Sequence, residues 1–432
     1  MNKKTVRKKV IIVGAGISGL AACRQLIEYG FEAIILEARD RIGGRIVADD
    51  RLGITFGSGA SWIHGNQDNP MTLLAEQFGA QMLPFDYGKF QTFDRNGQSV
   101  SHQDIQKFET KFEAYLEKAK QFAYQCSADI SLSAALSTVI KFETFTPIEE
   151  DLFNKKLSFF EGYIGDDSEY LSARYWDLEE SWPGQNCFLT SGYGPILEGL
   201  QKDCPVQLNS AVMEINTRVN DIEIITKNSI FYADAVLVTV PLGVLKQGDL
   251  KFNPPLPDSK QTAIQNLEMG LFNITAMKFK SAFWPKEPHA LFFTQFDKQS
   301  IQSFFNLYHF VNQPVLVGYT GGDRARRLEH FSDAEIIERT LSNLESVFGV
   351  RPAKPEIYFN TRWSQDSFSR GSFSYLKTGA SGADYESMAE PVSGRLFFAG
   401  EATSLKYPAT THGAYLSGIR EAKRIEKCIK YY

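Results

Sequence analysis

The sequence predicts a doubly wound α/β domain joined to a second domain of α+β type. Residues 10–13 are entirely apolar, and residues 235–240 are apolar except for Thr239. Both runs are typical of strands that are buried on both faces of a parallel sheet. A helical pattern over residues 17–29 follows the first run, so strand and helix alternate. At 432 residues the chain is also too long for one hydrophobic core.

Three glycines stand between the first strand and this helix. Gly14 permits a tight turn, Gly16 lets the backbone approach a pyrophosphate, and Gly19 lets helix and strand pack closely. The helix N-terminus offers free N–H groups and positive dipole to that phosphate. A second strand over residues 33–36 ends at Glu37, where an acid can bind ribose hydroxyls. Such glycines alone are as often an ordinary turn, but the whole succession predicts a dinucleotide site.

The composition argues against several other classes of protein. A formal net charge of -5 disfavours a general affinity for nucleic acid. No run approaches the about 18 apolar residues of a membrane span, and no apolar segment of signal-peptide length precedes the first strand. The five cysteines lack metal-like spacing, so we expect no metal site, and we expect reduced thiols in a cytoplasmic protein.

Three further elements are expected to be structural. Residues 104–125 carry apolar side chains at three- and four-residue steps, which predicts an amphipathic helix. Ser332 and Glu335 form a capping box, and the helix that they start should end at Gly349. Residues 215–226 predict a hairpin around two turn-favouring residues.

The segment that begins at Glu37 makes the prediction more specific. It reads Glu-Ala-Arg-Asp-Arg-Ile-Gly-Gly-Arg, and a loop with paired glycines and arginines can approach a cofactor and neutralise its phosphates. Together with the glycine motif, this segment resembles the flavin-dependent amine oxidase family. The resemblance implies FAD in a Rossmann-like domain of the glutathione-reductase type, beside a substrate domain with a mixed sheet.

Residues 59–66, Gly-Ala-Ser-Trp-Ile-His-Gly-Asn, resemble the flavin-contacting segment of that family in its acetylpolyamine and spermine oxidase form. The resemblance implies that Ser61 and Trp62 touch the isoalloxazine and that His64 lies beside the substrate. An imidazole pKa of about 6.5 would suit orienting an amine or accepting its proton. A single histidine is more often an ordinary core or surface residue, so that alternative stays open.

Acidic and aromatic side chains gather between residues 163 and 182. They could line a funnel that attracts a cation, or form an ordinary solvated face, and both interpretations stay open. The residues are Tyr163, Asp166, Asp167, Glu169, Tyr170, Tyr175, Trp176, Asp177, Glu179, Glu180 and Trp182.

Residues 188–194 lead into a predicted helix and then a strand that ends near Val212. By resemblance, the chain here returns to the FAD domain, and the backbone at Val212 meets the adenine. Residues 241–257 also resemble the family, with a Pro-Leu-Gly-Val-Leu-Lys run and a later Pro-Pro-Leu-Pro run.

The chain departs from the family at Ile274. The family usually has a lysine five residues before a phenylalanine, here Phe279, and that lysine holds a water against flavin N5. Lys278 would point to the same face of the strand, but four residues put it roughly 13 Å away, so it cannot substitute. We therefore expect flavin binding to be unaffected and flavin reoxidation, or even turnover, to be slow.

Residues 363–375 resemble the segment that supplies one aromatic wall of the amine-binding cage. Phe373 takes that place here. Ser372 stands where monoamine oxidases have a cysteine bonded to the flavin, so FAD is expected to be noncovalent.

Residues 394–418 complete the resemblance. A strand reaches the cofactor at Gly400 and Glu401, and a helix begins near Thr411 with N–H groups aimed at the flavin O2 side. Thr410 replaces the second aromatic of the cage, as in lysine-specific histone demethylases.

The expected site therefore draws on every motif. His64, Phe373 and Thr410 are the expected catalytic residues. The expected FAD-binding residues are Gly14, Gly16, Ser18, Gly19, Glu37, Arg39, Gly44, Arg45, Ser61, Trp62, Val212, Trp363, Phe368, Gly400, Glu401, Thr410, Thr411 and Ala414.

Three functions are compatible with these residues. We favour oxidation of a polyamine-like amine to imine and aldehyde, with oxygen as acceptor and hydrogen peroxide as product. Ile274 motivates the alternative of an FAD-binding protein with weak or no turnover. An L-amino-acid oxidase is less favoured, because Ser61 and Trp62 stand where such enzymes carry a carboxylate-binding arginine. Without an inserted coiled-coil arm or a preceding module, a chromatin demethylase is not expected either.

Domain boundaries follow from the same motifs. We expect a discontinuous FAD-binding domain of residues 1–85, 187–265 and 370–432, and a substrate domain of residues 86–186 and 266–369, with the site between them. The oligomeric state stays open.

Overall fold

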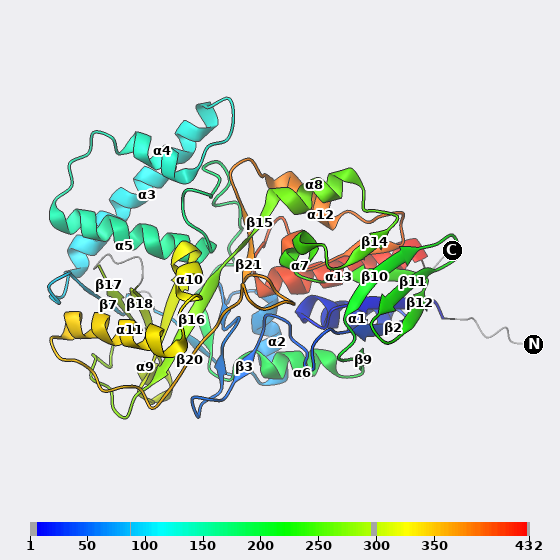
Figure 1. Ribbon diagram of the computed structural model, residues 1–432, viewed down its shortest axis with the longest axis horizontal. Coiled ribbons are helices and arrows are strands. Elements are labelled where there is room, and N and C mark those ends of the chain that lie inside the picture. The colour runs from blue at the N-terminus through cyan, green and yellow to red at the C-terminus, as the bar shows by residue number, and fades with distance from the viewer. Residues whose placement is uncertain (1–6, 87, 295–299, 430–432) are drawn as a thin grey trace, which may run out of the picture.

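A computed structural model of the chain describes residues 7–86, 88–294 and 300–429. Within these residues, a parallel sheet of five strands lies in the half of the molecule at the right of Figure 1. In spatial order its strands are β22 (Leu396–Phe398), β13 (Ala235–Val238), β1 (Lys9–Val13), β2 (Glu32–Leu36) and β9 (Val206–Gln207).

Strand β1 is buried on both faces, as its apolar run predicts. Val10 and Ile12 belong to the core on one side of the sheet, and Ile11 and Val13 belong to the core on the other. Alternate side chains of a strand point to opposite faces, so both faces of this sheet must be covered. The doubly wound α/β prediction is confirmed.

Helices cover the first face of the sheet. They are α1 (Ile17–Glu28), α2 (Pro70–Phe78), α6 (Gly194–Gln201) and α13 (Thr411–Ile429). Helices α1 and α13 lie side by side, blue and red in Figure 1. A Cβ added at Gly418 would lie 2.2 Å from the carbonyl oxygen of Ser18, so glycine is required where these helices cross.

A second sheet and three helices cover the other face. The strands are β12 (Ile230–Ala233), β11 (Ile222–Thr226), β10 (Val212–Thr217) and β14 (Lys251–Asn253). The helices are α7 (Leu242–Gln247), α8 (Asp258–Asn266) and α12 (Gly382–Ala389). Strands β10 and β11 form the predicted antiparallel hairpin.

The predicted strand that ends near Val212 is wrong. Strand β9 stops at Gln207, and Val212 instead opens β10. The N–H of Ser210 donates to the carbonyl oxygen of Glu37 at 2.7 Å, and Asn209 adopts a positive φ of 54°. These two features turn the chain across the end of β2 rather than along it.

The other half of the molecule is built on a mixed sheet, as expected. In the described part it contains, in order, β20 (Ile357–Asn360), β16 (Phe272–Lys278), β19 (Val315–Gly321), β18 (Ser303–Asn306), β17 (Ala290–Phe293) and β7 (Phe90–Phe93). The accompanying helices are α3 (His102–Gln125), α4 (Leu132–Val139), α5 (Pro147–Ile164), α9 (Leu307–Val311), α10 (Gly322–Leu328) and α11 (Asp333–Phe348). Helix α3 matches the predicted amphipathic helix, and α11 has the predicted capping box at Ser332.

Short strands connect the two halves. Strand β15 (Leu267–Gly270) pairs with β21 (Phe373–Leu376), and the pair runs between the halves in Figure 1. The remaining strands are β3 (Ala48–Asp49), β4 (Phe56–Gly57), β5 (Trp62–Ile63), β6 (Met82–Pro84) and β8 (Cys187–Leu189). Within the described ranges, none of the helices combines the length and apolar character that crossing a bilayer requires.

Candidate active site

The carboxyl ends of four parallel strands meet at one edge of the first sheet. Gly14 follows β1, Glu37 follows β2, Thr239 follows β13, and Gly400 follows β22 after one intervening residue. All four residues line a cavity of about 590 Å³. Open α/β sheets bind their ligands at this edge.

The glycine turn forms one wall of this cavity. Gly14 has a φ of +109°, and a Cβ there would lie 2.7 Å from Oγ1 of Thr239. A Cβ on Gly16 would point into open space. Gly43 donates its N–H to the Ala15 carbonyl at 2.9 Å, which brings the pair Gly43 and Gly44 against the turn at Gly14. The result is a cradle of bare backbone. Larger side chains would fill it and prevent the close approach of a pyrophosphate.

Gly19 does not belong to this wall. It lies outside the set of described residues that line the cavity, so the prediction that it binds the cofactor is not supported. A Cβ there would lie 2.1 Å from the carbonyl oxygen of Gly14. Gly19 therefore serves the packing of α1 against the turn, and any larger residue would displace the cradle.

Glu37 joins the loops around the cradle. Its Oε2 accepts the N–H of Ala15 at 2.6 Å, and its Oε1 accepts the N–H of Arg39 at 2.9 Å. The residue is only 5% exposed, so these charge-assisted hydrogen bonds replace water around a buried carboxylate.

The arginines of the next loop are less available than the sequence predicts. Arg39 makes a bidentate ion pair with Asp366, at 2.9 and 2.6 Å, and Arg45 pairs with Glu401 at 2.8 Å. Arg41 donates to the carbonyl oxygens of Ile42 and Gly44. Each guanidinium already has an acceptor in the protein, but the acceptors of Arg41 are neutral carbonyls, and Arg39 and Arg45 line the cavity. The expectation that this loop neutralises phosphates therefore stays a prediction. The N–H groups of the first turn of α1 and the helix dipole add positive potential at the cradle.

Another part of the cavity is lined by aromatic rings. The rings of Phe272 and Phe373 lie 6.3 Å apart, and both line it together with Ile274. Ser372 accepts the N–H of Phe272 at 2.8 Å and donates its hydroxyl to the carbonyl of the same residue at 2.9 Å. This double contact fixes Phe272 and occupies Oγ of Ser372. Lys278 instead donates to the carbonyl of Leu52, away from the cavity.

His64 lines the cavity, but its basicity is lower than expected. Burial lowers its pKa to about 4, below the value of about 6.5 that proton acceptance from an amine would favour. Among the described residues, its Nδ1 is buried without a hydrogen-bond partner. His412 is 2% exposed, and burial, with the charge of His64 as a smaller cause, lowers its pKa to about 3. Both imidazoles are therefore neutral near pH 7.

Helix α13 begins at the cavity. Thr410 accepts the N–H of Gly413 at 2.9 Å and donates its hydroxyl to the Tyr407 carbonyl at 2.9 Å. Its hydroxyl thus caps the helix rather than facing a substrate, which does not support the predicted catalytic role. Thr411 shares a hydrogen bond of 2.9 Å with Tyr193.

Glu401 is held in place by protein donors on several sides. Besides Arg45, it accepts the hydroxyl of Ser374 at 2.6 Å and the N–H of Ala409 at 3.0 Å. Its buried carboxylate therefore organises the loop before α13.

The acids of residues 163–182 do not form a funnel into this cavity. In the part of the chain that the structure describes, none of these residues lines it. Asp166 is buried in an ion pair with Arg326, and Asp177 pairs with Lys120 at 2.6 Å. Asp166 is buried, so it belongs neither to a funnel that attracts cations nor to a solvated face, the two interpretations given by the sequence.

Apart from Gly19, all residues predicted to be catalytic or to bind FAD line the cavity. Sequence reasoning missed a second group of cavity-lining residues. Some of them follow β13 or lie near β14, and the others are sequence neighbours of predicted site residues or of Ile274. The group includes Ser58, Met213, Thr239, Pro241, Val244, Asp249, Leu250, Phe272 and Ser367. Thr239 lies near the carboxyl end of the predicted strand 235–240, where a ligand was to be expected, so that signal was available.

A glycine cradle, a buried acid and a cavity at the carboxyl edge of a parallel sheet define a dinucleotide-binding protein of the Rossmann type. Residues 17–426 match the sequence pattern of the family described as flavin containing amine oxidoreductase. The chain belongs to this family, and the family prediction from the sequence motifs is confirmed. Flavin is therefore the cofactor that the cavity is built for, and the cradle fits its phosphates.

Known relatives fall into two groups at similar identity. Polyamine oxidase 2 of Arabidopsis thaliana is 34% identical over 437 residues, covering 97% of this chain and 88% of that protein. Lysine-specific histone demethylase 1 homolog 2 of the same plant is 36% identical over 441 residues, covering 98% of this chain. The chain spans 59% of that demethylase and 56% of the plant protein Flowering Locus D.

A solved structure supports the fold. A putrescine oxidase double mutant, redesigned in its cofactor binding, superposes with a TM-score of 0.78 at 18% identity. The match covers 98% of this chain and 99% of that one. This chain and the solved structure therefore share one fold over nearly their whole length.

The neutral buried histidines predict acid sensitivity. His412 has a pKa of about 3 when folded and about 6.5 when unfolded, so the unfolded chain binds the extra proton. The free energy of unfolding should therefore fall as the pH drops below about 6.5, with a slope of about 1 kcal/mol per pH unit from this residue. Urea unfolding of wild type and His412→Gln between pH 7 and 5 measures the slope. Equal slopes for the two proteins would contradict the assignment.

Proposed function

We propose that this chain catalyses the FAD-dependent oxidation of a polyamine-like amine, with oxygen as acceptor and hydrogen peroxide as product. One observation carries the proposal. A single cavity is lined both by the cradle of Gly14 and Gly16 and by Phe373 and His64. A dinucleotide and an amine can thus meet in one cavity, and positioning of this kind supplies much of catalysis.

The cradle residues would hold the dinucleotide. The N–H groups of the first turn of α1, which includes Ser18, are suited to the pyrophosphate, and Glu37 to ribose hydroxyls. The backbone near Val212 is suited to the adenine. The other predicted contacts are Arg39, Gly44, Arg45, Ser61, Trp62, Trp363, Phe368, Gly400, Glu401, Thr411 and Ala414, all of which line the cavity.

Noncovalent binding is supported by Ser372. Its hydroxyl is engaged on both sides by the backbone of Phe272, and serine has no thiol to bond to a flavin. We also propose the domain division given by the motifs, and a cytoplasmic location, which the free state of all five cysteines supports.

The bound flavin supplies a two-electron acceptor. The amine loses two electrons and two protons as its C–N bond becomes C=N, and water then hydrolyses the imine to an aldehyde. Oxygen takes up two electrons and two protons to give hydrogen peroxide. Phe373 provides an apolar wall along which a neutral amine can lie. With a pKa of about 4, His64 is suited to orient that amine through a hydrogen bond rather than to act as its base.

Ile274 supports a second candidate, a flavoprotein of the same fold with weak or no turnover. It is 5% exposed and lines the cavity at the position where the family pattern carries a lysine. An apolar side chain there can neither hold a water by hydrogen bonding nor supply positive charge.

The two candidates predict different outcomes with amines under anaerobic conditions. We expect the flavin absorbance to bleach with spermidine or N-acetylspermine, and peroxide to form when air is admitted. Putrescine, tyramine, L-amino acids and a dimethyl-lysine peptide complete the panel and separate the competing substrate classes. Yellow protein with equimolar flavin that none of these compounds bleaches would contradict the proposed oxidase and support the second candidate.

Ile274→Lys should separate the two halves of the reaction. We expect reoxidation by oxygen to accelerate by about tenfold, because a cation near the flavin stabilises developing negative charge, and we expect flavin reduction to change less. Stopped-flow measurement of each half-reaction provides the test, with Ile274→Met as the control that keeps the volume and adds no charge. Equal changes in both half-reactions, or none in either, would rule out this account of the position.

A further inference from the structure

The C-terminal end of helix α5 touches the aromatic wall of the cavity from behind. Gly165, the residue after the helix, has a φ of +90°, and a Cβ there would lie 2.7 Å from Cε2 of Phe373. Its carbonyl accepts the N–H of Leu271 at 2.7 Å. A Cβ on Gly270, which pairs with Phe373 across strands β15 and β21, would lie 2.9 Å from the same carbonyl oxygen. The ring of Phe373 thus rests on bare backbone.

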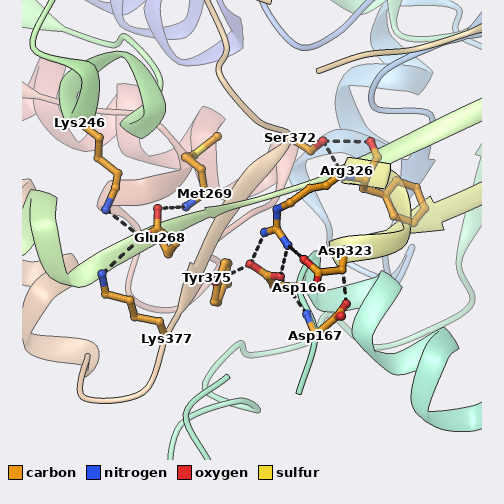
Figure 2. A network of polar contacts seen from close by, with 11 residues as sticks. Asp166, Asp167, Lys246, Glu268, Met269, Asp323, Arg326, Ser372, Tyr375 and Lys377 are labelled. Atoms are coloured by element: carbon orange, nitrogen blue, oxygen red, sulfur yellow. Dashed lines mark hydrogen bonds and ion pairs between the residues drawn. The ribbon is translucent and has the colours of Figure 1, made fainter. Parts of the chain in front are cut away.

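The next residue, Asp166, anchors this contact. It is 1% exposed, and Arg326 of α10 binds both of its oxygens, at 2.7 Å to Oδ1 and 2.5 Å to Oδ2. Tyr375 donates its hydroxyl to Oδ2 at 2.6 Å. Figure 2 shows the carboxylate between these two side chains, with Asp323 and Asp167 beside it.

Two consecutive residues after helix α5, Gly165 and Asp166, contact two alternate residues of strand β21, Phe373 and Tyr375. Phe373 and Tyr375 point to one face of the strand, and Ser374 points to the other, where it binds Glu401. Gly165 supports the ring of Phe373, and Asp166 binds the hydroxyl of Tyr375. The strand that carries the wall is therefore fixed to α5 at two successive points.

Helix α10 closes the arrangement. The N–H of Asp323 donates to Asp167 at 3.0 Å, and Arg326 also binds Asp323 at 2.7 Å. The N–H of Gly322 donates to the carbonyl of Leu271 at 3.0 Å. The guanidinium thus ties the end of α5 to the start of α10, and both elements hold the Leu271 backbone beside the wall.

We propose that Asp166 is a positioning residue, which through Arg326 and Tyr375 fixes the Phe373 ring at the distance where a substrate amine can lie against it. The other cavity ring, Phe272, is fixed separately by the backbone contacts of Ser372. The consequence for turnover rests on the proposed oxidase function, whereas the mechanical part, fixation of β15 and β21, does not.

The mechanical part can be measured without any substrate. In Asp166→Asn we expect the amides of the β15–β16 junction around Leu271 to exchange about tenfold faster, because the contact to Gly165 opens more often. Asp151→Asn is the matched control. Asp151 is also buried on α5, and Arg95 binds it with two donors, but it lies near the start of the helix, remote from the wall. Unchanged exchange near Leu271, or equal acceleration in both variants, would overturn the proposal.

The kinetic part uses a double-mutant cycle with an amine that the wild type turns over. With flavin content unchanged, Asp166→Asn should lower kcat/KM by about tenfold, since small misplacements are costly. The same substitution in a Phe373→Ala background should change kcat/KM less than about twofold, because the wall is already gone. Additive losses, or a comparable loss in Asp151→Asn, would show a general structural role and overturn the proposal.

Tyr375→Phe keeps the ion pair between Asp166 and Arg326 and removes only the hydroxyl that Asp166 binds. It therefore provides a second test if Asp166→Asn fails to fold. It should accelerate the same amides and lower kcat/KM in the same direction by a smaller factor, with the same non-additivity toward Phe373→Ala. If wild type oxidises no amine, the proposed function fails while the exchange experiment still decides the positioning role. Tyr375→Phe and Asp166→Asn proteins with wild-type exchange would refute the positioning role even where turnover is lowered.

Discussion

Glu37 is the residue on which the architecture of the site depends. Its carboxylate accepts the N–H groups of Ala15 and Arg39, while its backbone oxygen accepts Ser210 and its N–H donates to Gln207. A buried carboxylate is stable only when donors replace its lost water, and backbone N–H groups are the donors that loops can offer. The carboxylate thus joins the glycine turn to the loop after β2, and the backbone of the same residue holds the chain between Gln207 and Ser210 at this edge of the sheet.

Beyond Glu37, two parts of the cavity lining are stabilised by different interactions. The glycine cradle is built from backbone, and the arginines near it are already paired, as Arg39 is with Asp366. The part at Phe272 and Phe373 is built from rings, which need external support to keep their positions. Phe272 receives it from Ser372, and Phe373 receives it from the end of α5. The polar network around Asp166 thus serves an apolar wall, which explains why a buried ion pair lies so close to it.

Much of this site could be predicted because it depends on local sequence. The glycine turn, the acid after β2 and the strand interiors follow from spacing and apolar runs, and the structure places Gly14, Gly16 and Glu37 together as expected. The motif also predicts the packing role of Gly19, and its contact with the Gly14 carbonyl is of that kind. Its additional assignment as a cofactor contact lacks support, because it lies outside the described residues that line the cavity.

The remaining differences involve partners far apart in the chain. The pairing of Arg45 with Glu401, and of Asp166 with Arg326, joins residues more than a hundred positions apart, so no window of sequence contains them. The pKa of His64 depends on burial, which periodicity cannot give for a single residue in a short loop. Thr410 was assigned to substrate by its position, whereas its hydroxyl caps α13, because a helix that starts inside the molecule needs its N–H groups satisfied.

We propose that this cavity holds FAD without a covalent bond. Acid precipitation of the purified chain, followed by chromatography of the supernatant, is the decisive test. We expect FAD to be released in equimolar amount, leaving a colourless pellet. Flavin retained in the pellet, release of FMN in place of FAD, or a purified protein that neither contains FAD nor binds added FAD would refute noncovalent FAD binding.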